Sequence, residues 1–398
     1  AAMACFATGT AALLRGSGRR LTGVAAVSAD IETFAPAAGS SRSQALYAAA
    51  ARVMPGGNTR HTVTRHPHQV YAARGDGAYI TDVDGNRHAD FICNFGSVML
   101  GHNDAEVTRA CMEQLERGTV FGMPTSAEVD LAKILVERIP CVESVRFCNS
   151  GTEAVMLAVK AARACTGRRK IAKFEGCYHG GYDYVGVSEH PEPSEAGNEA
   201  EPLSLANDMG TSPQILEDVV VLPWNDLAAC KRLLSHHARE LACCIVCPAN
   251  LTMWMAQAEK GFLEGLYQHC KSLGLLYVAD EVLAFSTGFR GAHAEIAPSV
   301  QPDFMTLGKI IGGGFPVGAV AGRKELMDAV FVGQDGRLPL VYHGGTFNAN
   351  AMSMVAGAAV MRKLTPASYE HLTALRGRLA SRVQAAWADL GLEGYFGG

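Results

Sequence analysis

The chain has 398 residues, of which 48% are hydrophobic and 19% are charged, and its formal net charge is -4. This length and composition favour one large domain with a buried core plus a smaller one. They supply no basic surface for nucleic acid or an anionic membrane, and no apolar run reaches the roughly 18 residues that a membrane helix needs. We expect an intracellular protein, cytoplasmic or organellar, that acts on a small molecule.

The 12 cysteines are spread through hydrophobic segments rather than grouped in a short secreted framework, which predicts free thiols in a reducing compartment. Cys244 and Cys247 form a C-x-x-C, but it lies in an apolar run that begins at Leu241 and is typical of a buried strand. We therefore expect a core role for this pair. Redox or zinc chemistry is the alternative.

The chain begins with a segment, residues 1–40, that contains Arg15, Arg19 and Arg20 and no acid before Asp30. This composition is typical of an organelle transit segment, and a disordered tail is the alternative interpretation. Residues 41–105 then read as the N-terminal part of a small domain. A short helical stretch near 45–53 is expected there, and a strand hairpin is expected around the turn signal Asp84-Gly85.

Residues 106–350 show the pattern of an α/β domain. Apolar residues at helical spacing alternate with short β-branched runs, and most runs are separated by enough chain for a crossover helix. The expected strands are Ser144–Phe147, Lys170–Phe174, Val219–Leu222, Cys243–Val246 and Leu275–Ala279. These features predict a mostly parallel central sheet flanked by helices. Residues 187–217 break the pattern and predict a long loop, either a lid over a site or a disordered insertion.

Three segments in this domain could carry chemistry. Ser150, Gly151 and Thr152 follow an expected strand and open a helix, so their backbone N–H groups would form a phosphate site, although an ordinary helix cap reads the same. Asp280 ends a hydrophobic strand at the edge where open α/β sheets bind ligands; a metal ligand or a helix cap would look alike. Lys309 stands between apolar residues and a glycine cluster, which predicts a partly desolvated amine with a lowered pKa rather than a surface lysine.

Two further segments support a flat, phosphorylated ligand. Tyr178 follows the expected strand ending near Phe174, where its ring could lie on a planar cofactor, although a core or surface tyrosine is the simpler interpretation. Thr346, beside two glycines, suits a second phosphate contact or an ordinary turn. The neighbouring histidines, His179 and His343, read individually as structural residues.

Together these segments resemble the class III aminotransferase family of fold type I enzymes that use pyridoxal 5′-phosphate (PLP), and within it the glutamate-1-semialdehyde 2,1-aminomutase subgroup. The resemblance begins near Pro55 and is carried by NSGTEA, CYHGG, ADEV, LGKIIGGGFPVGA and GGTFNAN. It implies a large PLP-binding domain and a smaller α+β domain built from the N-terminal segment and from residues 351–398. The family usually carries Glu-Pro where this chain has Cys247-Pro248, and its members continue beyond residue 398, so we expect this C-terminal part to be incomplete.

The resemblance also implies roles for single residues. Lys309 would hold PLP as a Schiff base, and Asp280 would pair with the ring nitrogen. The ring would lie between Tyr178 and Val282, and its phosphate would be held by Ser150, Gly151 and Thr152. Thr346 would reach the phosphate of a neighbouring subunit's cofactor, which implies a homodimer with active sites at the interface. Arg60 would bind a substrate carboxylate.

The expected reaction is amino-group transfer in which Lys309 moves a proton between the substrate carbon and C4′ of the cofactor, with no metal ion. An aminomutase of the glutamate-1-semialdehyde type is the first expectation. The alternatives are a transaminase that passes the amino group of a β-amino acid or amine to a 2-oxo acid, and a PLP-binding protein without turnover.

Overall fold

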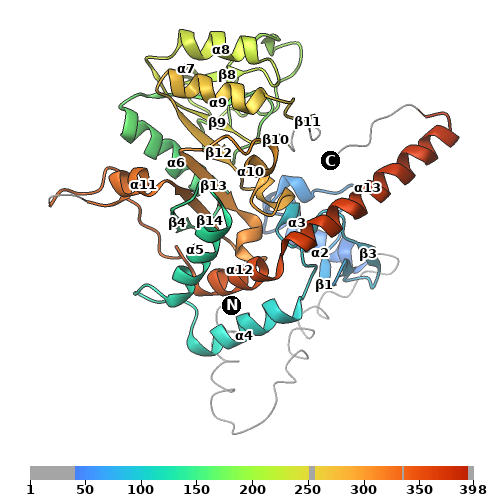
Figure 1. Cartoon of the computed structure of the whole chain (residues 1–398). Coiled ribbons are helices and arrows are strands. Elements are labelled where there is room, and N and C mark those ends of the chain that lie inside the picture. Colours follow the sequence, from blue (N-terminus) through green and yellow to red (C-terminus); the bar gives the residue numbers. More distant parts are fainter. Residues whose placement is uncertain (1–40, 251–255, 334–335, 393–398) are drawn as a thin grey trace. The chain divides into compact units, whose positions relative to one another are not determined.

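A computed structural model of the protein describes residues 41–250, 256–333 and 336–392 (Figure 1). The transit-like segment expected within residues 1–40 lies outside the described residues. The described residues belong to two compact units that divide between Asp90 and Phe91. The expectation that the N-terminal and C-terminal segments build one small domain stays a prediction.

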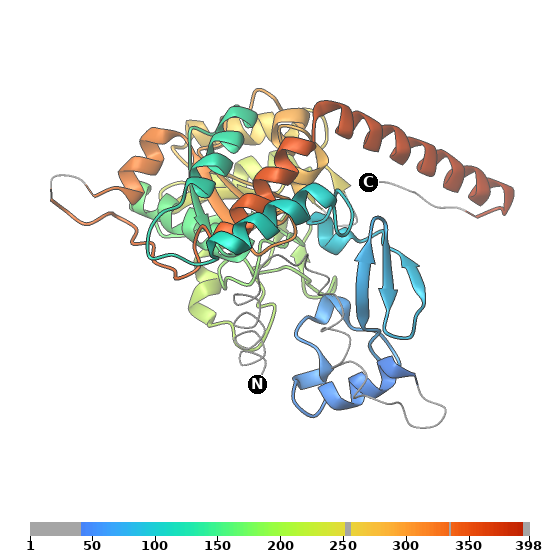
Figure 2. The ribbon, with the colours of Figure 1, turned by 90° about the horizontal axis from the view of Figure 1, so that it is seen from below.

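The first unit contains helix α2 (Arg42–Ala50), the short 3-10 helices η2 (Pro55–Gly57) and η3 (His61–Val63), and an antiparallel sheet that Figure 2 shows from below. The sheet has the order β1 (Ala72–Asp76), β2 (Tyr79–Asp82), β3 (Arg87–Ala89). The hairpin expected at Asp84-Gly85 is confirmed, since this dipeptide joins β2 to β3 and Gly85 has a φ of 88°. Asp84 also accepts hydrogen bonds from the first amides of α2, at 2.6 Å from Arg42 and 3.1 Å from Ser43.

Seven strands of the second unit's described residues form one sheet with the order β4-β14-β13-β12-β9-β5-β8. Their bounds are β4 (Ser144–Cys148), β14 (Gly318–Gly322), β13 (Phe304–Gly308), β12 (Leu276–Asp280), β9 (Leu241–Val246), β5 (Lys170–Phe174) and β8 (Val219–Leu222). Only β14 runs antiparallel to its neighbours among these seven. The mostly parallel sheet expected from the sequence is therefore confirmed.

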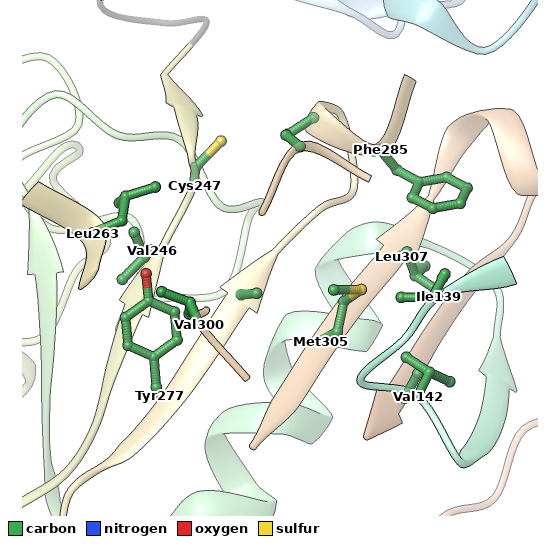
Figure 3. Packing of buried hydrophobic residues seen from close by; sticks show 14 of the residues in the cluster. Ile139, Val142, Val246, Cys247, Leu263, Tyr277, Phe285, Val300, Met305 and Leu307 are labelled. Atoms are coloured by element: carbon green, nitrogen blue, oxygen red, sulfur yellow. The ribbon is translucent and has the colours of Figure 1, made fainter. Parts of the chain in front are cut away.

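Helices cover both faces of this sheet, as Figure 1 shows. One face packs against α6 (Gly151–Thr166) and α11 (Lys324–Phe331), and the other against α5 (Ser126–Arg138), α8 (Leu227–His236), α9 (Phe262–Ser272) and α12 (Ala351–Lys363). Figure 3 shows part of the hydrophobic core on the second of these faces, where Tyr277, Met305 and Leu307 of the sheet meet residues of the segments that cover this face. Cys244 and Cys247 lie in this core, which confirms the structural interpretation of the C-x-x-C.

The remaining elements of the second unit are short or peripheral. They are α3 (Cys93–Gly96), α4 (Ala105–Arg117), β6 (Gly197–Asn198), β7 (Glu201–Pro202), α7 (Pro213–Glu217), β10 (Ala249–Asn250), β11 (Ala256–Gln257), η4 (Ala284–Thr287), α10 (Ala292–Ile296), η5 (Lys309–Gly312) and α13 (Pro366–Asp389). The expected loop at 187–217 is thus not wholly irregular, because β6 and β7 pair as a small ribbon and α7 ends it. None of the helices in the described ranges is long and apolar enough to cross a membrane.

Candidate active site

The candidate site lies at the carboxyl ends of neighbouring strands of the seven-stranded sheet. β12 ends at Asp280, and β13, which pairs with it in parallel, ends directly before Lys309. β4 ends at Cys148 and is followed by the turn that caps α6. Because parallel strands end at the same edge, the topology brings together three segments that are far apart in the sequence.

Asp280 is buried at the end of β12, and each of its oxygens accepts hydrogen bonds. Oδ1 accepts from the backbone N–H of Val282 at 3.1 Å and from the hydroxyl of Thr306 at 2.9 Å, while Oδ2 lies 2.6 Å from Nδ1 of His179. Burial alone would raise the pKa of Asp280, but His179 and the other two donors outweigh burial and hold the pKa below its ordinary value. The side chain is therefore a buried anion over the whole physiological pH range.

Lys309 follows β13 directly and has a left-handed backbone conformation, with a φ of 47°. Burial lowers the pKa of its amine, as its apolar flanks predict, and the negative charge of Asp280 opposes that shift. The structure thus places the lysine within electrostatic reach of the buried carboxylate. Such an amine gives up its proton more readily than an exposed lysine and can act as a nucleophile or base.

The turn before α6 is shaped to leave its first amides available. Ser150 is the N-cap of α6, and its hydroxyl accepts a hydrogen bond from the amide of Glu153 at 3.1 Å. At Gly151 an added Cβ would stand 2.6 Å from Cγ1 of Val282, so only glycine lets the turn and Val282 approach this closely. The helix dipole and the free amides at this end attract a phosphate group.

A loop after β5 closes over the same turn. The amide of Gly181 donates to Oγ1 of Thr152 at 3.1 Å, and Gly180, with a φ of 99°, lies so close that a Cβ there would stand 2.6 Å from that oxygen. Tyr178, in the same loop, leaves 48% of its surface exposed. Burial, and then the charges of Glu189 and Asp280, raise the pKa of its hydroxyl, so the ring is a neutral planar surface.

His179 is a site residue that the sequence interpretation missed. It is buried, it hydrogen-bonds Asp280, and its Nε2 has no hydrogen-bond partner within the described structure. The only signal in the sequence is its place in CYHGG after a buried strand, which does not reveal that its partner lies 101 residues further along.

The other expected residues divide into two groups. Ser150, Gly151, Thr152, Val282 and Asp280 lie in one contiguous group with Lys309 nearby. Thr346 instead lines a hollow of about 280 Å³ together with residues of 119–125. Arg60 belongs to the first unit, and its proposed contact with a substrate stays a prediction.

These residues fit a flat, phosphorylated heteroaromatic cofactor. The close approaches at Gly151 and Gly180 leave a cradle with backbone amides, the anion at Asp280 suits a protonated ring nitrogen, and a partly desolvated amine lies beside it. A metal centre has no comparable support, because the described residues contain no cluster of three or more candidate ligands. Together, the fold and this site define a PLP-dependent enzyme of fold type I.

The comparisons with known proteins agree with this class. Residues 61–385 match the family described as Aminotransferase class-III, and the chain belongs to this family. The glutamate-1-semialdehyde 2,1-aminomutase of Anaeromyxobacter sp. is 38% identical over 358 residues, which are 88% of this chain and 80% of the relative.

Solved structures share both the fold and much of the sequence. An omega-transaminase from Sphaerobacter thermophilus is 43% identical with a TM-score of 0.87, over 90% of this chain and 81% of that one. A β-phenylalanine aminotransferase from Variovorax paradoxus is 34% identical with a TM-score of 0.76, over 87% of this chain and 75% of that one. Membership of the family makes this chain a PLP-dependent enzyme that transfers amino groups of small molecules.

Proposed function

We propose that this enzyme rearranges glutamate-1-semialdehyde as an aminomutase, with Lys309 as its proton carrier. The observation that carries the proposal is the pairing of a buried carboxylate with a lysine whose pKa burial lowers, at the ends of two adjacent parallel strands. The choice of substrate draws support from the curated relatives that match 80% of their own length.

Besides Lys309, we assign six residues to the binding of the cofactor. Ser150, Gly151 and Thr152 would bind the phosphate, and Tyr178 and Val282 would enclose the ring. Asp280, kept ionised by His179, would hold a proton on the ring nitrogen. When bound, PLP supplies an electron sink that stabilises negative charge at the neighbouring substrate carbon.

Lys309 then has two tasks. Its amine would hold the cofactor until a substrate amine replaces it, and its freed Nζ would accept a proton from the substrate carbon that bears the amino group. The same nitrogen would deliver that proton to C4′ of the cofactor. The lowered pKa supports both tasks, because a neutral amine is needed to take up the proton.

The substrate contacts and the assembly belong to the same proposal. A guanidinium at Arg60 suits the substrate carboxylate, because it can donate two parallel hydrogen bonds. We further propose a homodimer in which Thr346 reaches the phosphate of the neighbouring subunit's cofactor. Exposed apolar residues around the hollow that Thr346 lines, among them Phe121, Met123 and Phe347, support a partner surface there. An intracellular location fits the cysteines of the described ranges, all of which are free thiols.

A transaminase is the second candidate function. The observation that favours it is the 43% identity to an omega-transaminase, supported by the 34% identity to a β-phenylalanine aminotransferase. Cys247 is buried directly after β9 and lies near Lys309, so this chain presents a thiol where the resemblance implies a carboxylate.

Two incubations of the purified holoenzyme distinguish these functions. An aminomutase converts glutamate-1-semialdehyde into a product of the same elemental composition without any 2-oxo acid. A transaminase instead requires both β-phenylalanine and 2-oxoglutarate and releases glutamate. Lys309→Ala is the control and should abolish either reaction. Turnover only in the second incubation would refute the aminomutase, and turnover in neither would refute both candidates.

A further inference from the structure

Lys173 is a buried charge for which the proposed reaction has no use. It lies on β5, the neighbour of the edge strand β8, its exposed surface is 0%, and it pairs in register with Val221 of β8. The flanking residues Ala172 and Phe174 belong to the hydrophobic core. Placing an ammonium group in such a strand is costly unless strong hydrogen bonds compensate for the lost water.

The compensation comes from two backbone carbonyls that converge on one nitrogen. Nζ of Lys173 donates to the carbonyl of Cys177 at 2.9 Å and to the carbonyl of Val187 at 2.5 Å. These carbonyls mark the two ends of residues 177–187, which we call the clasped loop. A backbone hydrogen bond of 2.8 Å from Gly176 to Ser188 joins the same two ends just outside the lysine.

The clasped loop carries the contacts that complete the cofactor site. It presents Tyr178, it sends His179 to Asp280 at 2.6 Å, and its Gly181 amide donates to Thr152 at 3.1 Å. The first of these residues follows directly after the carbonyl that Lys173 holds. A shift of that carbonyl would therefore move the tyrosine ring and the histidine together.

We propose that Lys173 is a positioning residue for the PLP site, which sets Tyr178 against the cofactor and His179 against Asp280 by tying the two ends of the clasped loop together. The proposal rests on the roles given above for Tyr178, which would enclose the cofactor ring, and for His179, which keeps Asp280 ionised. It assigns Lys173 no contact with cofactor or substrate.

The charge state of Lys173 agrees with this role. Burial lowers its pKa to about 8, while the charges of Glu189 and Glu175 oppose the shift. At neutral pH the side chain is still mainly an ammonium, and its hydrogen bonds to the two carbonyls are charge-assisted. Such bonds are shorter and stronger than those of a neutral donor.

The test compares Lys173→Met with Lys170→Met in the holoenzyme. Methionine keeps the length and apolar character of the lysine stem but donates nothing to the two carbonyls. Lys170 stands at the opposite end of the same strand, where it pairs with Glu240 at 3.2 Å, so its variant reports what losing any lysine of β5 does. The readouts are the affinity for PLP, the visible circular dichroism of bound PLP, kcat and KM, and the melting temperature.

For Lys173→Met we expect a folded protein that binds PLP about tenfold more weakly. A tenfold loss of affinity corresponds to the free energy of about one charge-assisted hydrogen bond. The visible circular dichroism of its bound PLP should weaken, and kcat should fall by a larger factor than KM changes. Lys173→Gln, which restores N–H donors, should recover part of the signal, and Lys170→Met should match the wild type.

A Lys173→Met protein that only melts earlier, with unchanged PLP affinity and dichroism, would overturn the proposal. So would failure of both the Met and the Gln variants to fold, since Lys173 would then serve folding itself. The affinity and dichroism need no substrate. If the wild type binds PLP but turns over neither substrate, the proposed function fails while this comparison still decides the role of Lys173.

Discussion

Asp280 and Glu281 are adjacent in the sequence, but their side chains have different surroundings. This difference allows a sharp test of the site. Asp280 faces the candidate cofactor site, whereas the buried Glu281 accepts hydrogen bonds from the amides of Ala292 and His293 at 3.0 and 2.7 Å. We therefore expect Asp280→Asn to impair the reaction and spare the fold. Glu281→Gln should destabilise the fold and spare the reaction.

The expected size follows from the hydrogen bonds around Asp280. An asparagine oxygen at the Oδ1 position keeps the donors Val282 and Thr306, and its NH₂ group then faces Nδ1 of His179. Nδ1 of His179 can accept that bond in the tautomer in which it carries no hydrogen. The fold should therefore survive, and the change removes mainly one charged partner of the ring nitrogen, about 1.5–3 kcal/mol or roughly 10- to 150-fold in rate.

The Glu281 variant serves as the matched control. A glutamine NH₂ group placed among the amides of Ala292 and His293 leaves donors facing donors, which should cost about 1–3 kcal/mol of stability. Single-turnover rates, the absorption spectrum of bound PLP and thermal unfolding are measured for both variants. An Asp280→Asn enzyme with the wild-type rate and spectrum, or a Glu281→Gln enzyme that loses its spectrum first, would refute the assignment.

Three further predictions concern the cradle, the lysine and the first unit. Gly151→Ala should weaken PLP binding, measured by spectral titration, because the new Cβ would stand 2.6 Å from Val282; an unchanged dissociation constant would contradict the cradle. Cys247→Glu should raise the pKa of Lys309, since a carboxylate adds negative charge nearby; the pH titration of the PLP band should move upward, and a downward shift would contradict it. Burial alone would raise the pKa of Asp82, but the hydrogen bonds it accepts lower it to about 2, so the stabilisation it gives is complete above about pH 4 and is lost as the pH falls towards 2. Cleavage of residues 72–90 by an acid protease should rise across that window, and an Asp82→Asn variant, lacking this carboxyl, should show a smaller rise.

The parts of the fold with strong local patterns were predictable. β12 is an apolar run that ends in an acid, and β4, β5 and β8 are short β-branched runs, so strand type and order along the chain followed from the sequence. β14 was not expected, because its sequence, GAVAG, is rich in residues that are rare in strands. Its reversed direction follows from the short connection after β13, which leaves no room for a crossover helix.

The parts of the site made by long-range contacts were not predictable. His179 and Lys173 each occupy one position in an otherwise ordinary segment. In IAKF, Lys173 lies on the same face of the strand as Ile171, and because helices and loops cover both faces of the sheet the side chain is fully buried. Only the folded chain shows that Val187 returns to accept its hydrogen bond.

The backbone conformation at Lys309 bears on why a lysine stands at this position. Gly308 is extended, and the next residue turns abruptly to a φ of 47°, a conformation that a lysine adopts at a cost of about 1 kcal/mol or more. A glycine at this position would relieve the strain, so local backbone preference does not explain the lysine. The presence of a lysine at this position is explained by the burial that lowers the pKa of its amine and by the nearby charge of Asp280. Both act on the side chain, and neither needs the backbone to be relaxed. The backbone strain, the burial and the nearby carboxylate thus all occur at one residue, as expected for a lysine that takes part in the chemistry.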